Sequence, residues 1–335
     1  MANDVFSVNQ ENPFHAKRIE LLGAIERELN RMYKKKFSVI SYVFNTSDPT
    51  VNFPMQNSHI IYIEDLIRLS KSDDNDILCL IIDSYGGDAN FPTELVNRIH
   101  AYYEEFYVIG INMLKSAATL LSILSNKIIA VSTASFGPID PQIMYSTSEG
   151  IPIAISARAV IDLFEHLLPE YVKDKTAAER TVILSTQNYH LYQQAKDAVN
   201  LIDIVLNSMN FPKAHLQEVR AKLITTPPSH GLRISVDDLI DLGFPVEKIQ
   251  VSDTLASLLF EYHRRALRNL IMESPVAPQG MINRGLVLFE STKRSLQITA
   301  TLPYLPVALP ISRPAVPVSK PSEGSHPFPS APDKK

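Results

Sequence analysis

Apolar residues recur at helical spacing near the start of the chain and form short continuous runs further on. Leu22, Ile25 and Leu29 lie three and four positions apart, which predicts a helix over residues 15–34. Residues 77–82 are apolar without a break, a pattern typical of a strand that is buried on both faces of a sheet. The chain therefore combines amphipathic helices with fully buried strands, which indicates an α/β protein.

The middle of the chain alternates between strand and helix patterns. After residues 77–82, apolar runs predict strands at 106–111 and 127–131, and helices are predicted over 90–103 and from Ser116 onward. Strands that alternate with helices at this spacing indicate βαβ units and a mainly parallel sheet. Further helices are predicted at 156–168, 176–209 and 236–242.

Composition divides the chain into four segments. We expect an irregular N-terminus over residues 1–14, one α/β domain over 15–250 and an α-helical extension over 251–302. Nine of the 23 prolines lie in the remaining 33 residues, 303–335, which predicts a disordered tail with polyproline character. Such a tail suits a partner that has a groove for proline-rich peptides.

Charge and composition argue against several classes of protein. The net charge is −4, whereas nucleic-acid binders usually carry an excess of basic residues. The one cysteine, Cys79, forms no internal disulfide, and the sequence has no metal-ligand spacing and no phosphate or dinucleotide loop. The apolar stretch 117–131 is broken by polar residues, and the N-terminus lacks the basic region of a signal peptide. We therefore expect a cytoplasmic protein with no transmembrane segment, metal, cofactor or nucleic-acid partner.

Two turns at the ends of neighbouring predicted strands bring polar groups together. Gly86 and Gly87 follow one buried strand, and Ser116 follows the next strand and opens a helix. The carboxyl ends of parallel strands share one edge of a sheet, where reactive sites collect. There the Ser116 hydroxyl is placed to attack a carbonyl, and the Gly87 and Ala117 amides to hold the oxyanion. Each feature alone has a simpler interpretation, because serine often caps a helix and paired glycines often form only a turn.

Three segments resemble the serine dehydrogenase proteinase family, a branch of the Clp/crotonase fold that is related to Clp proteases and signal peptide peptidases. Residues 81–87 are similar to the strand and glycine turn of the oxyanion hole in these enzymes, and residues 115–121 are similar to their nucleophile helix. The most specific match is the Gly-Pro-Ile-Asp-Pro-Gln run at 137–142. The resemblance extends from residue 15 to residue 250.

The resemblance implies a Clp/crotonase-like spiral of ββα units with a mainly parallel sheet and an α-helical C-terminal extension. It also implies a nucleophile at Ser116, an oxyanion hole near Gly86, Gly87 and Ala117, and assembly into homo-oligomeric rings or stacks. Tyr85 departs from the family pattern, because many relatives carry proline before the two glycines, and this departure bears on the backbone path of the hole.

The general base that activates Ser116 has three candidates. Clp proteases carry a histidine on the strand after the nucleophile helix, but this chain has Asp140 there, which is expected to orient the base or to cap its own turn. His230 comes first, because its ordinary pKa suits a general base near neutral pH. Lys115 is adjacent to the serine and would need a lowered pKa. Lys196 comes last, because it lies on a long predicted helix where a solvated position is the simpler interpretation.

These features favour an ATP-independent serine peptidase, of Ser-His or Ser-Lys type, that cleaves peptides or unfolded polypeptides through an acyl-enzyme at Ser116. The alternative is a catalytically weak or inactive assembly or adaptor protein of the same fold, which the missing Clp-type histidine and the proline-rich tail favour. A crotonase-type acyl-CoA enzyme would use the same oxyanion geometry, but such enzymes normally lack a serine at the nucleophile position.

Overall fold

The computed structural model describes residues 4–7, 13–48, 53–72, 77–146, 152–209, 213–225, 231–272 and 281–303. The helices are α1 (Pro13–Tyr33), α2 (Ile60–Ser70), α3 (Phe91–His100), α4 (Ala117–Ile123), α5 (Ala157–Asp162), α6 (Leu168–Val172), α7 (Ala177–Ser185), α8 (Tyr189–Ser208), α9 (Lys213–Arg220), α10 (Val236–Asp241) and α11 (Thr254–Met272), with a 3-10 turn η1 (Asn57–His59) and π-helical turns η2 (Leu163–Leu167) and η3 (Ala221–Thr225). The strands are β1 (Asp4–Ser7), β2 (Phe37–Phe44), β3 (Ile77–Ser84), β4 (Glu105–Leu114), β5 (Lys127–Val131), β6 (Ser135–Phe136), β7 (Gln142–Ser146), β8 (Pro152–Ser156), β9 (Ile234–Ser235), β10 (Val246–Ile249), β11 (Met281–Ser291) and β12 (Ser295–Pro303).

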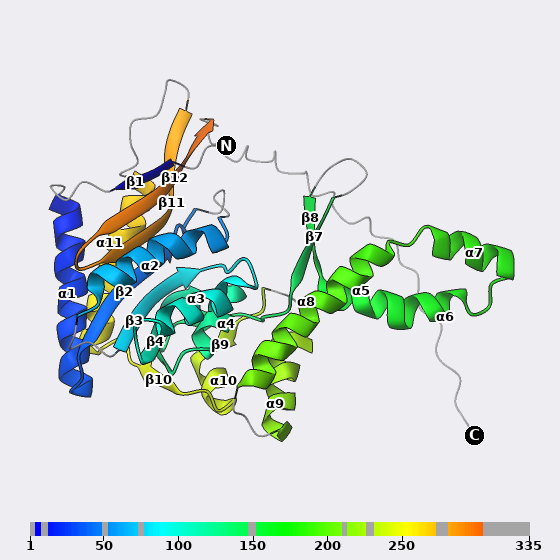
Figure 1. The fold of residues 1–335 in the computed structure, drawn as a ribbon, viewed down its shortest axis with the longest axis horizontal. Helices are drawn as coiled ribbons and strands as arrows, with labels where there is room; N and C mark the ends of the chain where they lie inside the picture. Colours follow the sequence, from blue (N-terminus) through cyan, green and yellow to red (C-terminus); the bar gives the residue numbers. More distant parts are fainter. Residues whose placement is uncertain are drawn as a thin grey trace, which may run out of the picture.

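A mainly parallel sheet forms the centre of the molecule (Figure 1). Its strand order is β1-β12-β11-β2-β3-β4-β5-β10, and the stretch from β2 to β10 is parallel throughout. The antiparallel strands β11, β12 and β1 extend one edge, while the short strand β6 pairs with β4 and β9. The predicted α/β fold with a mainly parallel sheet is confirmed.

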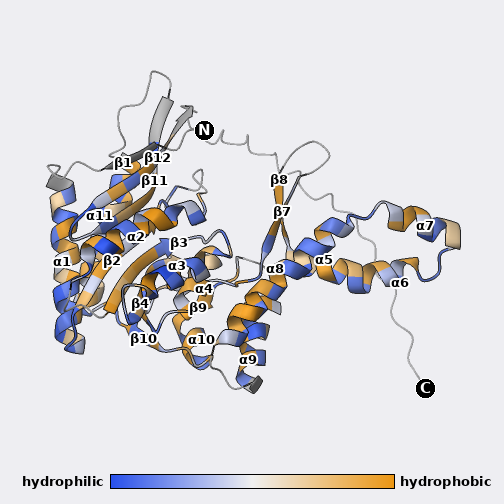
Figure 2. Cartoon of the chain, in the orientation of Figure 1, coloured by the Kyte–Doolittle hydropathy of each residue, from blue (hydrophilic) through white to orange (hydrophobic). Residues whose placement is uncertain are grey.

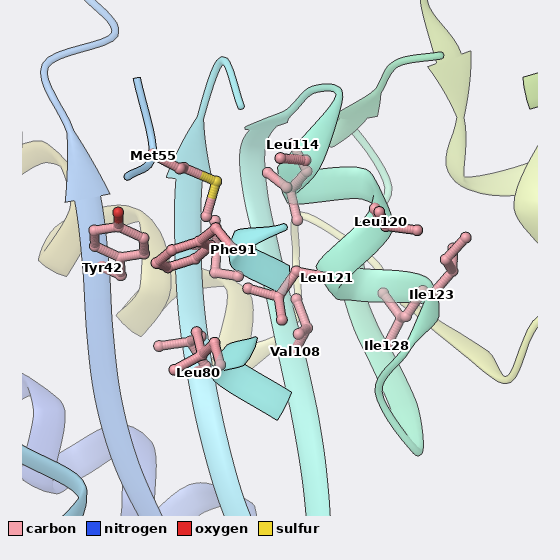
Figure 3. Close-up of a cluster of buried hydrophobic side chains, with 14 of the residues drawn as sticks. Tyr42, Met55, Leu80, Phe91, Val108, Leu114, Leu120, Leu121, Ile123 and Ile128 are labelled. Carbon is pink, nitrogen blue, oxygen red and sulfur yellow. The ribbon is translucent and has the colours of Figure 1, made fainter. Parts of the chain in front are cut away.

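Helices cover both faces of the sheet because side chains alternate along each strand. In β3, Leu78 and Leu80 pack with α2, α3 and α4, whereas Cys79 and Ile81 pack with α1 and α11. Figure 3 shows the first of these layers, with Leu80 of β3 and Leu121 of α4 among its buried side chains. Burial on both faces explains why residues 77–82 lack any polar position.

The C-terminal extension was predicted to be helical over residues 251–302, and this prediction is wrong beyond Met272. Residues after α11 form β11 and β12, and β11 pairs with β2, so this segment is part of the main sheet. The strand pattern is hidden in the sequence because β11 carries a fully buried charge at Glu290, which Arg18 of α1 neutralises. Strand patterns with polar positions in the core are easily missed.

Two smaller predictions also need correction. Residues 1–14 were expected to be irregular, but β1 pairs with β12 and α1 already begins at Pro13. The single helix predicted over 176–209 is two helices, α7 and α8, because Thr176 and Asn188 each cap a separate helix N-terminus. The proline-rich tail that follows Pro303 lies outside the described residues.

An arm formed by α5, α6, α7 and part of α8 projects from the body of the molecule (Figure 1). The β7–β8 hairpin, which the sequence patterns did not predict, lies between the arm and the body. Large apolar side chains are exposed along the arm, and they include Leu163, Leu167, Tyr171 and Val182. In Figure 2, stretches of the arm are coloured orange for hydrophobic residues.

Candidate active site

The glycine turn after β3 is held in place by four hydrogen bonds. The Gly86 N–H donates to the Ser84 hydroxyl at 3.0 Å, and the Lys115 N–H donates to the Ser84 carbonyl at 3.0 Å. Met55 pairs with Gly87 in a parallel bridge, in which its N–H donates to Gly86 and its carbonyl accepts from Asp88. Gly86 has a φ of 95°, which only glycine adopts without strain, so the turn depends on this residue.

Ser116 lies on a sharp turn between β4 and α4. Its φ of 50° and ψ of −117° fall in a region that residues with a side chain rarely occupy. Such a conformation costs on the order of 1–3 kcal/mol and persists only where the surroundings impose it. Here all seven residues of α4 are buried, so the helix cannot shift to relieve the strain. The strained turn leaves the serine side chain half-buried rather than packed in the core.

The two turns meet, as the sequence predicted. A Cβ placed on Gly86 would lie 2.7 Å from the Ser116 Cβ and 3.0 Å from the Ala117 nitrogen. The Gly87 and Ala117 amides donate no hydrogen bond to any residue that the structure describes. Gly87 is exposed, so its amide is within reach of a ligand. Two backbone donors and one hydroxyl are therefore gathered at the carboxyl edge of β3 and β4, where an oxyanion could be stabilised.

Thr119 connects the nucleophile helix to the segment that carries the Gly-Pro-Ile-Asp-Pro-Gln run. Its hydroxyl donates to the Leu114 carbonyl at 2.5 Å and accepts from the Gly137 N–H at 3.1 Å. Strand β6 runs parallel to the end of β4 and brings Gly137 beside Lys115, where a Cβ would lie 2.7 Å from the Lys115 Cδ. The two most specific motifs of the sequence thus form one packed unit in the structure.

Lys115 points toward β6 and makes no hydrogen bond to the Ser116 hydroxyl. Its ammonium donates to the Ser135 hydroxyl at 2.8 Å and to the Phe136 carbonyl at 2.7 Å. Burial lowers the pKa of Lys115, and the positive charge of Arg233 lowers it further. A lowered pKa is the property that a lysine base requires. In this orientation, however, the ammonium is hydrogen-bonded to β6 and not to the serine.

The other predicted partners of Ser116 lie elsewhere or outside the described residues. The Ser116 hydroxyl makes no hydrogen bond to any residue that the structure describes. Lys196 is exposed on α8, with its ammonium 5.3 Å from the centre of the Tyr192 ring, which fits the solvated position. Asp140 is buried and accepts from the Gln142 side chain at 2.8 Å, and His230 lies outside the described residues.

A buried polar pair that the sequence patterns did not reveal lies beneath the glycine turn. Asp83 is fully buried at the end of β3, and the Nε2 atom of His263 in α11 lies 2.6 Å from its carboxylate. The two residues are 180 positions apart, and His263 sits within an ordinary amphipathic helix pattern. No local signal could therefore have linked them.

A cleft of about 720 Å³ opens between the first half of α2, the exposed side of α3 from its start to Arg98, and the C-terminal half of α8. The N-terminal turns of these two helices lie at the carboxyl edge of the parallel strands, which is also the edge of the glycine turn. Asn90, three residues after Gly87, lines the cleft. The walls combine apolar residues with an ion-paired rim, and they include Ile60, Ile61, Glu64, Glu94, Arg98, Leu201 and Ile204.

Comparison with known proteins decides the family. A model of the ClpP-like SDH-type serine proteinase family matches residues 16–276. The chain belongs to this family. The resemblance that the three motifs indicated is thereby confirmed, and with it the assignment to a family of serine peptidases.

Solved structures show a remote likeness to this family member. The 1510-N membrane-bound stomatin-specific protease shares 14% identity, with 70% of this chain and 84% of that chain covered and a TM-score of 0.34. ClpP1 from Listeria monocytogenes shares 15% identity, with 72% of this chain and 98% of that chain covered and a TM-score of 0.30. No curated protein matches the chain.

The residues that the structure describes contain neither a candidate membrane span nor a candidate metal cluster. In the described part of the chain, no helix has both the length and the hydropathy that a bilayer span requires. Across the same residues, no three His, Cys, Asp or Glu side chains gather in a way that could hold a metal ion.

Proposed function

We propose that the protein is an ATP-independent serine endopeptidase that cleaves peptides or unfolded polypeptides through an acyl-enzyme at Ser116. One observation carries the proposal: the strained Ser116 turn meets Gly86, beside two backbone amides, at Gly87 and Ala117, that have no partner in the described residues. Strain at a non-glycine residue is typical of a functional turn between a strand and a helix.

The chemistry follows the usual course of acyl transfer. The Ser116 oxygen attacks the substrate carbonyl while a base takes its proton, and the carbonyl oxygen becomes an oxyanion that accepts hydrogen bonds from Gly87 and Ala117. The same proton then passes to the leaving amine as the peptide bond breaks. Water then attacks the carbonyl of the acyl-enzyme ester in the same way, which releases the acid product and restores the Ser116 hydroxyl.

The cleft beside Asn90 supports a polypeptide substrate. Its volume lies within the range of about 300–1,000 Å³ that is common for ligand sites. Its walls carry exposed apolar side chains, with Ile61 and Ile204 each 66% exposed. Segments of an unfolded polypeptide present large apolar side chains, whereas a folded protein keeps most of them buried.

We propose His230 as the first candidate for the base, with Lys115 as the second. Strand β9 pairs antiparallel with β6, with Ile234 opposite Phe136, so residues 231–233, which precede β9, lie toward the sheet edge of Ser116. His230 comes four residues before Ile234. A base from a neighbouring subunit is compatible with the same geometry, because the exposed apolar arm supports assembly of a homo-oligomer.

A second candidate function is a non-catalytic assembly or adaptor protein of this family. It is favoured by the Ser116 hydroxyl, which has no hydrogen-bond partner among the described residues, and by the proline-rich tail as a docking segment. Both functions suit the cytoplasm, and the buried free thiol of Cys79 agrees with a reducing compartment.

Peptide hydrolysis by matched serine variants tests the proposal. Ser116→Ala is expected to abolish cleavage of an unstructured fluorogenic polypeptide, without ATP, while Ser58→Ala, at an exposed serine of η1, retains the wild-type rate. Cleavage that survives Ser116→Ala would refute the peptidase. A stable oligomer that cleaves nothing and loses a bound proline-groove partner on removal of residues 303–335 would instead favour the adaptor.

A further inference from the structure

Asp83 is a fully buried carboxylate that gathers donors from three parts of the chain. It accepts from the Thr46 hydroxyl at 2.7 Å, from the Met113 N–H at 2.9 Å and from the Asn112 amide at 3.3 Å. These three groups all donate, so the Asp83 carboxyl is their common acceptor, and the His263 Nε2 lies 2.6 Å from the same carboxyl. A buried carboxylate is tolerated only when its oxygens are satisfied in this way.

The carboxylate lies where the pairing of β3 and β4 breaks register. Ile82 pairs with Gly110, but Ser84 pairs with Leu114, so one residue of β3 faces three residues of β4. The extra residues bulge out of the ladder, and the side chain of Asp83 accepts from the Met113 N–H, which has no register partner on β3. At the bulge, the Asp83 side chain therefore accepts the hydrogen bond that a backbone carbonyl of β3 would otherwise accept.

Both ends of this bulge lead directly into the candidate site. Gly86 is three residues after Asp83, and Ser116 is three residues after Met113. The bulge sets how far Ser116 advances along β4 relative to the glycine turn. A slip of one residue would displace the serine by about 3.3 Å, whereas a misplacement of about 1 Å can already cost on the order of 100-fold in rate.

His263 holds Asp83 from the opposite layer of the molecule. Its helix, α11, packs on the sheet face that α4 does not cover, and the histidine is only 8% exposed. The structure records no hydrogen bond from His263 to Ser116 among the described residues, so its role is confined to the carboxylate.

We propose that Asp83, held by His263, is a positioning residue that fixes the register between the Ser116 turn and the Gly86–Gly87 turn. The inference rests on the peptidase function proposed above. The same role predicts a change in the protein without substrate. When the carboxylate is removed, the bulge and the glycine turn lose their common anchor, and their backbones become less ordered.

Asp83→Asn tests the role with a matched control. The variant keeps the shape but presents an N–H₂ group to a ring of donors, and we expect kcat for peptide cleavage to fall at least 100-fold with KM changed less than threefold. Glu290→Gln is the control, because Glu290 is an equally buried carboxylate on β11, and it should lose stability while keeping kcat. An Asp83→Asn enzyme that is folded and keeps its kcat would overturn the inference.

Hydrogen exchange separates this inference from the peptidase proposal. In Asp83→Asn, amides of residues 84–90 and 111–117 should exchange at least tenfold faster than in the wild type, and in Glu290→Gln they should not. This result is expected even if the wild-type protein cleaves nothing, in which case only the peptidase proposal fails. If Asp83→Asn does not fold, His263→Gln replaces it, with the same pattern of exchange and a loss of kcat of about tenfold or more; unchanged exchange and kcat would overturn the inference.

Discussion

Replacing Gly86 with alanine perturbs the contact on which the candidate site depends. The new Cβ would lie 2.5 Å from the Lys115 carbonyl oxygen and 2.7 Å from the Ser116 Cβ. These neighbours are a backbone oxygen and a Cβ of the Ser116 turn, so neither can rotate away. The glycine turn and the serine turn must therefore separate, and the alanine must also adopt a φ near 95°.

The size of the effect follows from these distances. Non-bonded carbon atoms pack best about 3.5 Å apart. To remove the clash with the new Cβ, the two turns must therefore separate by about 1 Å. A shift of this size should lower kcat on the order of 100-fold, with up to 1,000-fold if one oxyanion donor is lost completely. Overpacking and the positive φ together should lower the free energy of unfolding by about 2–5 kcal/mol.

The assay compares Gly86→Ala with Gly23→Ala. Gly23 lies in α1, where an added Cβ would meet only the flexible end of Arg27 at 3.4 Å, so this variant should gain about 0.5–1 kcal/mol and keep its kcat. Peptide cleavage and urea unfolding are measured for both proteins. A Gly86→Ala protein that is folded and cleaves at the wild-type rate would refute the convergence of the two turns as the basis of catalysis.

Three further predictions concern stability and are each measured by urea unfolding. Thr119→Val should cost about 1–3 kcal/mol, because it leaves the Gly137 N–H without its acceptor; an unchanged midpoint would contradict the link between the two motifs. Arg18→Leu should cost about 3–5 kcal/mol, because it leaves the Glu290 carboxylate without its cationic partner; a loss well below this range would show that the pair is not structural. Burial lowers the pKa of His59 from 6.5 to about 4, so the unfolded chain binds the proton first and stability should fall by up to about 3 kcal/mol as the pH drops from 6.5 to 4. His59→Gln should flatten this pH dependence, and an unchanged slope would contradict it.

The parts of the fold that the sequence predicted are those with a strong local signal. Strand β3 is buried on both faces, and its run of apolar residues can be read directly. The glycine turn and Ser116 could be predicted because each follows such a strand, and parallel strands bring their carboxyl ends together. Strand order thus predicted that the serine turn lies beside the glycine turn, whereas the role of Ser116 as a nucleophile came from the family resemblance.

The remaining features depend on contacts between distant residues. β11 was missed because its buried Glu290 interrupts the apolar pattern, and only Arg18, 272 positions away, makes that burial possible. His263 was missed for the same reason, since its partner Asp83 lies on another element. The backbone strain at Ser116 has no sequence signature, because it comes from the packing around α4.

Covalent labelling with a fluorophosphonate tests the central claim most directly. The probe reacts with a serine whose hydroxyl is activated beside an oxyanion hole, so mass spectrometry of the labelled protein should find the adduct on the peptide that contains Ser116. Labelling should be lost in Ser116→Ala and retained in Ser58→Ala. An oligomeric, folded wild-type protein that takes up no probe at Ser116, or that is labelled equally after Ser116→Ala, would contradict the account.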